Sequence, residues 1–169
     1  MPMGASAILQ KENRPFGLVQ NIMDLFSSAK KDYVRSVVSW RTRYSTNIES
    51  VDNQHKEIFG IINNYIDSIL KGFGKLKTKY ILDELIQACR EHFDHEEGLM
   101  LQNEYPGLYS HKHTHKHFIS ELLEIKNKID SNPFPISIST GDFIRKWTVN
   151  HILTSDKAYS TFMRLRRVA

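Results

Sequence analysis

Three turn-forming segments divide most of this chain into four stretches with helical periodicity. The segments are rich in Gly, Pro and Asn, which end helices, and they cover residues 71–75, 103–107 and 130–135. Between them, apolar residues recur at steps of three and four over residues 52–70, 77–102, 108–129 and 139–156 or slightly beyond. Helices of similar length with short connections pack as antiparallel neighbours. The sequence therefore predicts an all-α, up-down-up-down four-helix bundle.

An additional amphipathic helix is predicted ahead of the bundle, from Phe16 to about Val38. Its apolar residues fall at helical steps, with lysine and arginine between them. We expect residues 1–37 to form an N-terminal extension and residues 38–169 to form the bundle. The extra helix either packs on the domain or on a second copy of the chain, or it docks on a protein partner or a membrane surface.

Charge and composition narrow the classes of function. The net charge is +4, and residues 1–45 carry all of it, with seven Lys/Arg against three Asp/Glu. The remainder has 16 of each, so we expect no nucleic-acid binding. No apolar run approaches the roughly 20 residues of a transmembrane helix, and no secretory signal is recognisable. The single cysteine, Cys89, excludes an internal disulfide framework, so we expect a cytoplasmic protein.

The second helix directs metal-binding side chains into the core. His92 and Glu96 are four residues apart and therefore share the apolar face of this helix. Arg90, Asp94 and Glu97 are expected to point away from that face. A buried carboxylate without a partner is costly, so Glu96 requires one.

The third helix carries four alternating histidines, and helical phase selects two of them. His111 and His115 share a side with the apolar residues of this helix, whereas His113 and His117 share a side with polar ones. We therefore expect the first pair to point inward and the second pair to be solvated. The alternative is a histidine-rich surface tract that binds metals adventitiously.

His55 on the first helix and His151 on the fourth also lie on apolar faces. A lone histidine there is more often a hydrogen-bonded core residue than a ligand. Five inward histidines and a glutamate, however, could hardly satisfy one another by hydrogen bonding. Six donors are too many for one tetrahedral zinc ion, and calcium and magnesium prefer oxygen ligands. Two transition-metal ions fit the count, and the Glu-x-x-His motif of ferritin-like di-metal bundles is absent.

Over residues 40–165, the chain resembles the bacterial hemerythrins. After Trp40, the matching pieces are VDNQHKEIF (51–59), HFDHEEGLM (92–100), YP (105–106), HKHTHKHF (111–118) and WTVNHILTSDKAY (147–159). These pieces have the order and the spacings of the family, including His-x3-Glu, His-x3-His and His-x4-Asp.

The resemblance implies two iron ions joined by bridging carboxylates and an oxo or hydroxo group, with O2 as the ligand. The implied metal ligands are His55, His92, Glu96, His111, His115, His151 and Asp156. Glu96 and Asp156 would bridge the two ions. In a regular helix Asp156 would be rotated by about 140° from His151, so we predict an irregular turn between them.

The resemblance also implies an apolar O2 pocket, lined by Ile58, Phe93, Trp147, Thr148 and Ile152. Thr148 stands where relatives often have leucine. A hydroxyl facing the cavity would alter oxygen affinity or autoxidation. We expect an oxygen-binding protein that acts as a carrier, store or sensor module and not as an enzyme. The alternatives are a di-iron oxidase, peroxidase or nitric-oxide-handling enzyme and, more weakly, an iron-storage protein.

Overall fold

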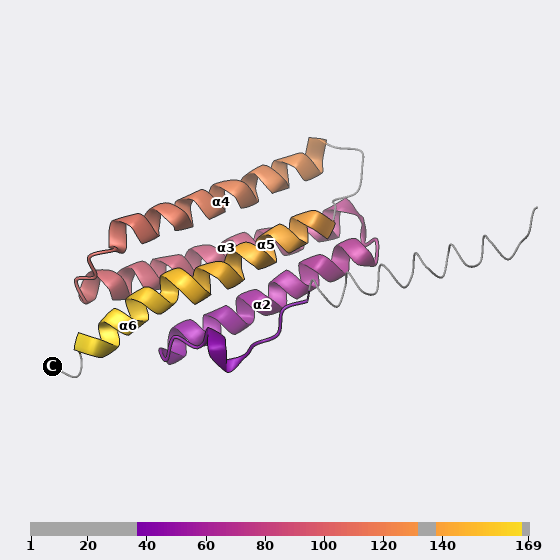
Figure 1. Cartoon of the computed structure of the whole chain (residues 1–169). Helices are drawn as coiled ribbons and strands as arrows, with labels where there is room; N and C mark the ends of the chain where they lie inside the picture. The colour runs from indigo at the N-terminus through magenta and orange to yellow at the C-terminus, as the bar shows by residue number, and fades with distance from the viewer. Residues whose placement is uncertain (1–36, 132–137, 167–169) are drawn as a thin grey trace, which may run out of the picture. The chain divides into compact units, whose positions relative to one another are not determined.

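The computed structural model describes residues 37–131 and 138–166 of the chain. Residues 16–36 of the predicted amphipathic helix lie outside the described residues, so this helix and the boundary after residue 37 stay predictions. The described part forms a four-helix bundle, as the sequence predicts (Figure 1). None of its helices is long and apolar enough to cross a membrane.

The helices follow the chain in antiparallel order (Figure 1). After a short 3-10 turn, η1 (Thr42–Tyr44), the long helices are α2 (Glu49–Leu70), α3 (Gly74–Gln102) and α4 (Leu108–Ser131). The fourth rod consists of α5 (Ile138–His151), the π-helical turn η2 (Ile152–Asp156) and α6 (Lys157–Arg166). This rod runs about ten residues beyond the expected end near Asp156, because no Gly or Pro follows that residue to break it.

A tight turn between α2 and α3 replaces the longer break that composition suggested. Gly72 and Gly74 both have positive φ, at 64° and 66°. Residues with a side chain rarely adopt this conformation, so the two glycines allow the chain to reverse within three residues. As a result, α3 begins at Gly74, three residues before its expected start.

The start of α2 is fixed by a buried carboxylate. Asp52 accepts hydrogen bonds from the backbone N–H (2.7 Å) and hydroxyl (2.8 Å) of Thr46 and from the hydroxyl of Ser45. Lys157, the first residue of α6, donates to the carbonyl of Ser45. These bonds tie the first turn of α2 to the first turn of α6. Both helices are thereby held next to the layer that contains His55 and Asp156.

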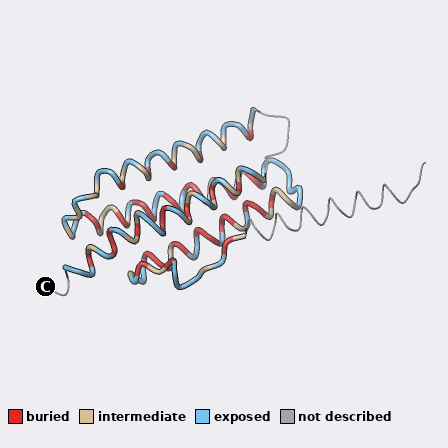
Figure 2. Tube along the Cα trace, viewed as in Figure 1, coloured by how far each residue is buried: buried red, intermediate tan, exposed pale blue. Residues whose placement is uncertain are grey.

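The apolar core has two parts, which lie on either side of a polar layer. The larger part includes Leu85 on α3 and Phe118 on α4, and the smaller part contains Met100, Tyr159 and Met163. Figure 2 shows buried residues along the inward side of every helix. On α3 the polar residues His92 and Glu96 come between the two parts. The core therefore encloses the polar layer from both ends.

The π-helical turn confirms the irregularity predicted between His151 and Asp156. The backbone N–H of Lys157 reaches the carbonyl of Ile152, five residues earlier. Such a wide turn contains one residue more than an α-helical turn. It brings a residue five positions on back toward the same side of the helix, so that both His151 and Asp156 are buried.

A glycine contact between α5 and α2 yields a stability prediction. A Cβ atom at Gly141 would lie 2.7 Å from Cγ1 of the fully buried Ile66. Replacing Gly141 with Ala should therefore destabilise the fold by about 1–3 kcal/mol, because the packed neighbour cannot move away. Urea denaturation at equal metal content measures this change.

Gly60 provides the matched control, since it lies exposed in the middle of α2 with no atom within 4 Å of its added Cβ. Gly60→Ala should stabilise the protein by about 0.5–1 kcal/mol through helix propensity alone. Equal stability of the two variants would contradict a close approach of the helices at Gly141.

Candidate metal centre

Seven buried side chains from all four rods converge in the polar layer. They are the residues that the sequence predicts as ligands: His55 on α2, His92 and Glu96 on α3, His111 and His115 on α4, His151 at the end of α5 and Asp156 at the end of η2. Each is at most 6% exposed. The structure brings the whole set together, and the role of each residue as a ligand stays a prediction.

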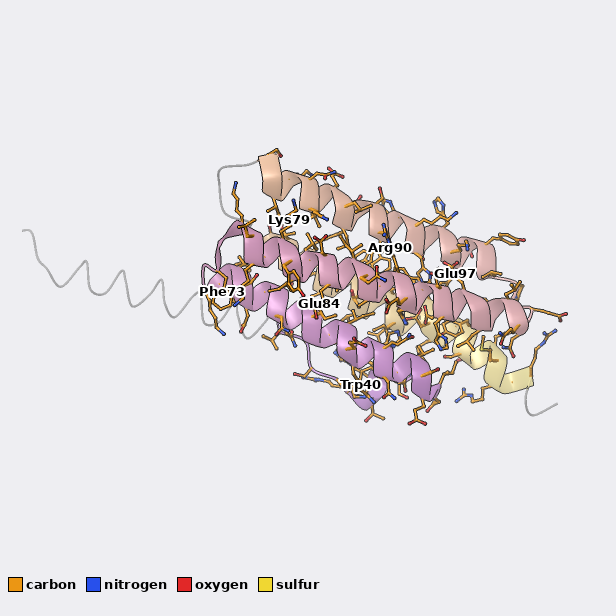
Figure 3. All side chains as sticks on the ribbon, turned by 180° about the vertical axis from the view of Figure 1, so that it is seen from behind. Trp40, Phe73, Lys79, Glu84, Arg90 and Glu97 are labelled. Atoms are coloured by element: carbon orange, nitrogen blue, oxygen red, sulfur yellow. The ribbon has the colours of Figure 1, made fainter. Side chains whose placement is uncertain are left out.

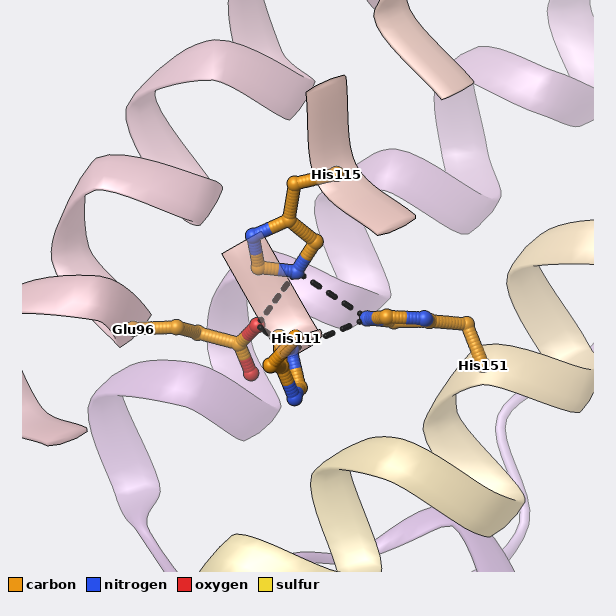
Figure 4. Close-up of side chains that lie close together, drawn as sticks. All are labelled: Glu96, His111, His115 and His151. Atoms are coloured by element: carbon orange, nitrogen blue, oxygen red, sulfur yellow. Dashed lines mark hydrogen bonds and ion pairs between the residues drawn. The ribbon is translucent and has the colours of Figure 1, made fainter. Parts of the chain in front are cut away.

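The donors form two overlapping groups, and within each group the ligand atoms lie within 4.8 Å of one another. One group contains Glu96 and three histidines, His111, His115 and His151 (Figure 4). The other group contains both carboxylates and two histidines, His55 and His92. The first group is therefore richer in histidine than the second.

The two carboxylates link these groups. Oδ1 of Asp156 lies 3.2 Å from Nε2 of His151, whereas its Oδ2 lies 3.2 Å from Nε2 of His55. Oε2 of Glu96 lies 3.4 Å from Nε2 of His115 in the first group and 3.5 Å from Nε2 of His92 in the second. This is the arrangement required of carboxylates that bridge two cations.

Unsatisfied polar atoms test whether the residues suit a metal centre. Oε2 of Glu96 and both carboxylate oxygens of Asp156 are buried and have no hydrogen-bond partner. The Nε2 atom of His151 lies 3.0 Å from that of His115 and 3.1 Å from that of His111. Three facing nitrogens would bring lone pairs or N–H groups against one another. Cations between the nitrogens and the oxygens would satisfy both sets, so the donors fit a two-metal centre.

Hydrogen bonds on the far side of two imidazoles fix the direction of their lone pairs. Nδ1 of His92 lies 3.2 Å from Oε1 of Gln54, and Nδ1 of His115 lies 3.1 Å from Oε1 of Glu97. Because both oxygens only accept, each Nδ1 carries the proton and each Nε2 keeps a lone pair directed at the centre.

Glu97 corrects one sequence expectation. It was expected to point away from the inward face, but it supports His115 and accepts a second bond from Lys112. Glu97 lies on α3, about 100° around the helix from Glu96, and its long side chain reaches sideways to α4 (Figure 3). Helical phase describes the direction of Cβ and therefore misses such lateral contacts.

Tyr159 is another supporting residue that the phase analysis missed. Its hydroxyl donates a hydrogen bond of 2.6 Å to Oε1 of Glu96. Burial and the neighbouring Glu96 carboxylate raise the pKa of Tyr159, so the hydroxyl keeps its proton. Oε1 is thereby occupied, and Oε2 faces the histidines of both groups. Tyr159 lies three residues after Asp156, a spacing at which helical neighbours share a side.

The pKa shifts favour the neutral form of two of the imidazoles and the ionised form of Glu96. Burial lowers the pKa of His92 to about 4 and also lowers the pKa of His115. Burial raises the pKa of Glu96, but nearby histidines outweigh it and bring this pKa well below its ordinary value. Neutral imidazoles and carboxylates are the forms that bind metals.

A small cavity of about 10 Å³ adjoins the second group of donors and has room for about one water-sized molecule. All five residues predicted for the O2 pocket line it: Ile58, Phe93, Trp147, Thr148 and Ile152. Four of the converging donors also line it, namely His55, His92, His151 and Asp156. Cys89 and Phe118 also line the cavity, although neither belongs to the predicted pocket. Their wall position depends on how the helices pack.

Comparisons with known proteins agree with this geometry. Residues 46–162 match the family model described as "Hemerythrin HHE cation binding domain". The bacteriohemerythrin of Methylococcus capsulatus is 30% identical over 125 residues, which cover 73% of this chain and 95% of the relative. The chain belongs to the hemerythrin family. Myohemerythrin-1 of Phascolopsis gouldii is also 30% identical, over 71% of this chain and 89% of its own length.

Solved structures extend this hemerythrin likeness to three dimensions. The crystal structure of a wild-type hemerythrin has a TM-score of 0.69 at 29% identity and covers 74% of this chain and 96% of its own. The hemerythrin fold therefore accounts for nearly all of the described bundle.

The third helix offers a matched test of the metal centre in this hemerythrin-family chain. His115 is buried, whereas the side chain of His117, two residues further on, is 66% exposed. His115→Ala should lower the iron content of the purified protein from about two ions per chain toward one or none, because it removes a donor from the first group.

His117→Ala should leave the iron content unchanged. Iron analysis by mass spectrometry, with circular dichroism as a check on folding, measures both variants. Equal iron loss in the two variants would favour the surface-tract alternative.

Proposed function

We propose that this protein binds O2 reversibly at a di-iron centre held by the seven converging residues. Glu96 and Asp156 bridge the two ions, His111, His115 and His151 hold one of them, and His55 and His92 hold the other. The bound iron pair supplies the redox-active, coordinatively open metal that O2 requires.

The position of the apolar cavity is the observation that carries the proposal. It is lined by three donors of the group with only two histidines, His55, His92 and Asp156, and by His151 of the other group. With both carboxylates shared between the two ions, the group with two histidines offers four protein ligands and the other offers five, which leaves room for an external ligand beside the former. The cavity size suits a diatomic molecule, and its walls of Ile58, Phe93 and Ile152 favour an uncharged one.

Two polar side chains of the cavity wall are poor proton donors, which favours binding over oxidative turnover. The hydroxyl of Thr148 donates to the carbonyl of Ile144 at 2.9 Å, so its hydrogen is committed to the helix backbone. Burial raises the pKa of Cys89 to about 12, so its thiol stays protonated and is neither an acid nor a nucleophile near neutral pH. Neither side chain therefore supports a proton-assisted reaction of O2.

Aromatic stacking holds the donors around the cavity in place. Phe93 stacks on His115 with ring centroids 3.7 Å apart, and Trp147 stacks on His151 at 4.6 Å. Trp147 also stacks on Phe118 at 3.7 Å. The rings that exclude water from the pocket therefore also orient two imidazoles. A dry pocket and a correct donor geometry thus depend on the same side chains.

Rapid mixing of the reduced, iron-loaded protein with O2 tests the proposal. Reversible binding should give a visible absorption that persists after mixing and disappears when the sample is flushed with argon. An enzyme of the oxidase or peroxidase class would instead oxidise irreversibly and consume O2 repeatedly in the presence of a reductant. An oxygen electrode records that turnover, and sustained consumption would overturn the binding proposal.

Thr148 and Ile58 provide a paired test of the cavity wall. Because the Thr148 hydroxyl is already bonded, Thr148→Val should change the autoxidation rate by less than about twofold. Ile58→Asn places an unsatisfied polar group against the cavity and should speed autoxidation about tenfold, which corresponds to roughly 1.4 kcal/mol. The decay of the oxygenated spectrum in air measures both rates. A large effect of Thr148→Val would show that its hydroxyl acts on the bound ligand.

A further inference from the structure

A second opening, separate from the apolar cavity, reaches the first donor group. It is a surface cleft of about 340 Å³ between the start of α4 and the η2–α6 segment. Its lining includes Ser110, His111, Thr114, Thr154, Ser155 and Ala158. His111 alone among the seven converging donors lines it. The apolar cavity, by contrast, is lined by donors of both groups but not by His111.

Hydrogen bonding gives the cleft the character of an acceptor. The hydroxyl of Thr114 donates to the carbonyl of His111 at 2.7 Å, and that of Thr154 donates to the carbonyl of Asn150 at 2.8 Å. The hydroxyl of Ser110 donates to the carbonyl of Gly107 at 2.9 Å. Because these hydroxyl groups donate their hydrogens to backbone carbonyls, their oxygens offer only lone pairs to a ligand in the cleft. These three oxygens can accept hydrogen bonds from the water shell of a hydrated cation.

The two carboxyl groups behind His111 also favour a cation. Nε2 of His111 lies 3.4 Å from Oδ1 of Asp156 and 3.6 Å from Oε2 of Glu96. Within the described part of the chain, both carboxylates form ion pairs only with histidines. The end of the cleft therefore presents two carboxyl groups whose ion pairs include no lysine or arginine, and carboxylate oxygens are ligands that attract cations.

The wall of the cleft is held firmly. The ring of Tyr105 lies so close to Gly107 that an added Cβ would be 2.6 Å from Cε1 of the tyrosine. Tyr105 also packs against Phe162, with ring centroids 5.2 Å apart. Lys157 precedes Ala158, but its ammonium group donates to the carbonyl of Ser45. Lys112 follows His111, and its ammonium group donates to Glu97. Both lysines next in sequence to lining residues are thus engaged elsewhere.

We propose that this cleft is the route by which hydrated ferrous ions reach the metal centre. His111 is the first donor that an ion meets, and Asp156 and Glu96 lie directly behind it. Because both carboxylates face both donor groups, an ion can pass from the first group to the second without leaving its oxygen ligands. The inference rests on the proposed di-iron centre, and it assigns ions and O2 to separate openings.

Ala158 allows a charge test of this route, since it is exposed, lines the cleft and is not one of the converging donors. The metal-free full-length chain is mixed anaerobically with Fe2+, and uptake is followed by stopped-flow absorption at low ionic strength. Ala158→Lys should slow uptake about fivefold, because an ammonium near the path repels a divalent ion. Ala158→Glu, of similar length, should speed uptake, and both effects should largely disappear in about 1 M salt.

Ser120 is the matched control, because it is exposed on α4 and does not line the cleft. Ser120→Lys and Ser120→Glu should load at the rate of the unmodified protein. All variants should reach the same final iron content, and the release rate of O2 from the loaded proteins should be unchanged. Circular dichroism verifies that each variant is folded.

The outcomes separate the two proposals. If the Lys and Glu variants of Ala158 load at the same rate, or if Ser120→Lys slows loading as strongly, the route is wrong even when two irons bind. If the unmodified protein takes up far from two ions per chain, the di-iron centre itself fails. A charge-dependent rate at Ala158 with an unchanged end point supports the cleft as the path of the ions.

Discussion

The structure depends on two carboxylates that are buried at the middle of the bundle. Glu96 and Asp156 are fully inaccessible, and three of their four oxygens have no hydrogen-bond partner. An unpaired buried charge opposes folding by about several kcal/mol. Bound cations remove this penalty, and the free energy of metal binding then adds to that of folding. The polar layer therefore lowers the stability of the metal-free chain and raises the stability of the metal-loaded one.

Two openings with different linings adjoin the polar layer. Aromatic and aliphatic side chains close one side around a space for a small neutral molecule. Hydroxyl-bearing side chains line the other side, where a wider cleft meets solvent. A carboxylate and an amide behind the imidazoles, together with the Tyr159 hydroxyl on Glu96, fix the donors between them. In the proposed function, rigid donors with two different approaches would allow the protein to keep its metals while it exchanges a gas.

Helical periodicity was enough to predict the bundle and the inward direction of most donors. Both follow from the 3.6-residue repeat, which also separates the buried His115 from the exposed His117. Asp156 required the family resemblance, because its position depends on a local change of helix type. Glu97 and Tyr159 act through lateral contacts between helices, and the two openings arise from the packing of segments far apart in sequence. Neither kind of feature has a period that a single sequence displays.

The π-helical turn before Asp156 also determines the register of everything that follows it. Such a turn is equivalent to an α-helix with one inserted residue, so α6 continues about 100° out of step with α5. Tyr159 and Met163 pack in the smaller core only because of that offset. Deleting a single residue from η2 would restore a uniform helix, and it would turn these two side chains away from the bundle together with the carboxylate. One extra amino acid thus links the Asp156 carboxylate, the tyrosine that supports Glu96 and the closing end of the core, so that the three can be lost or kept only together.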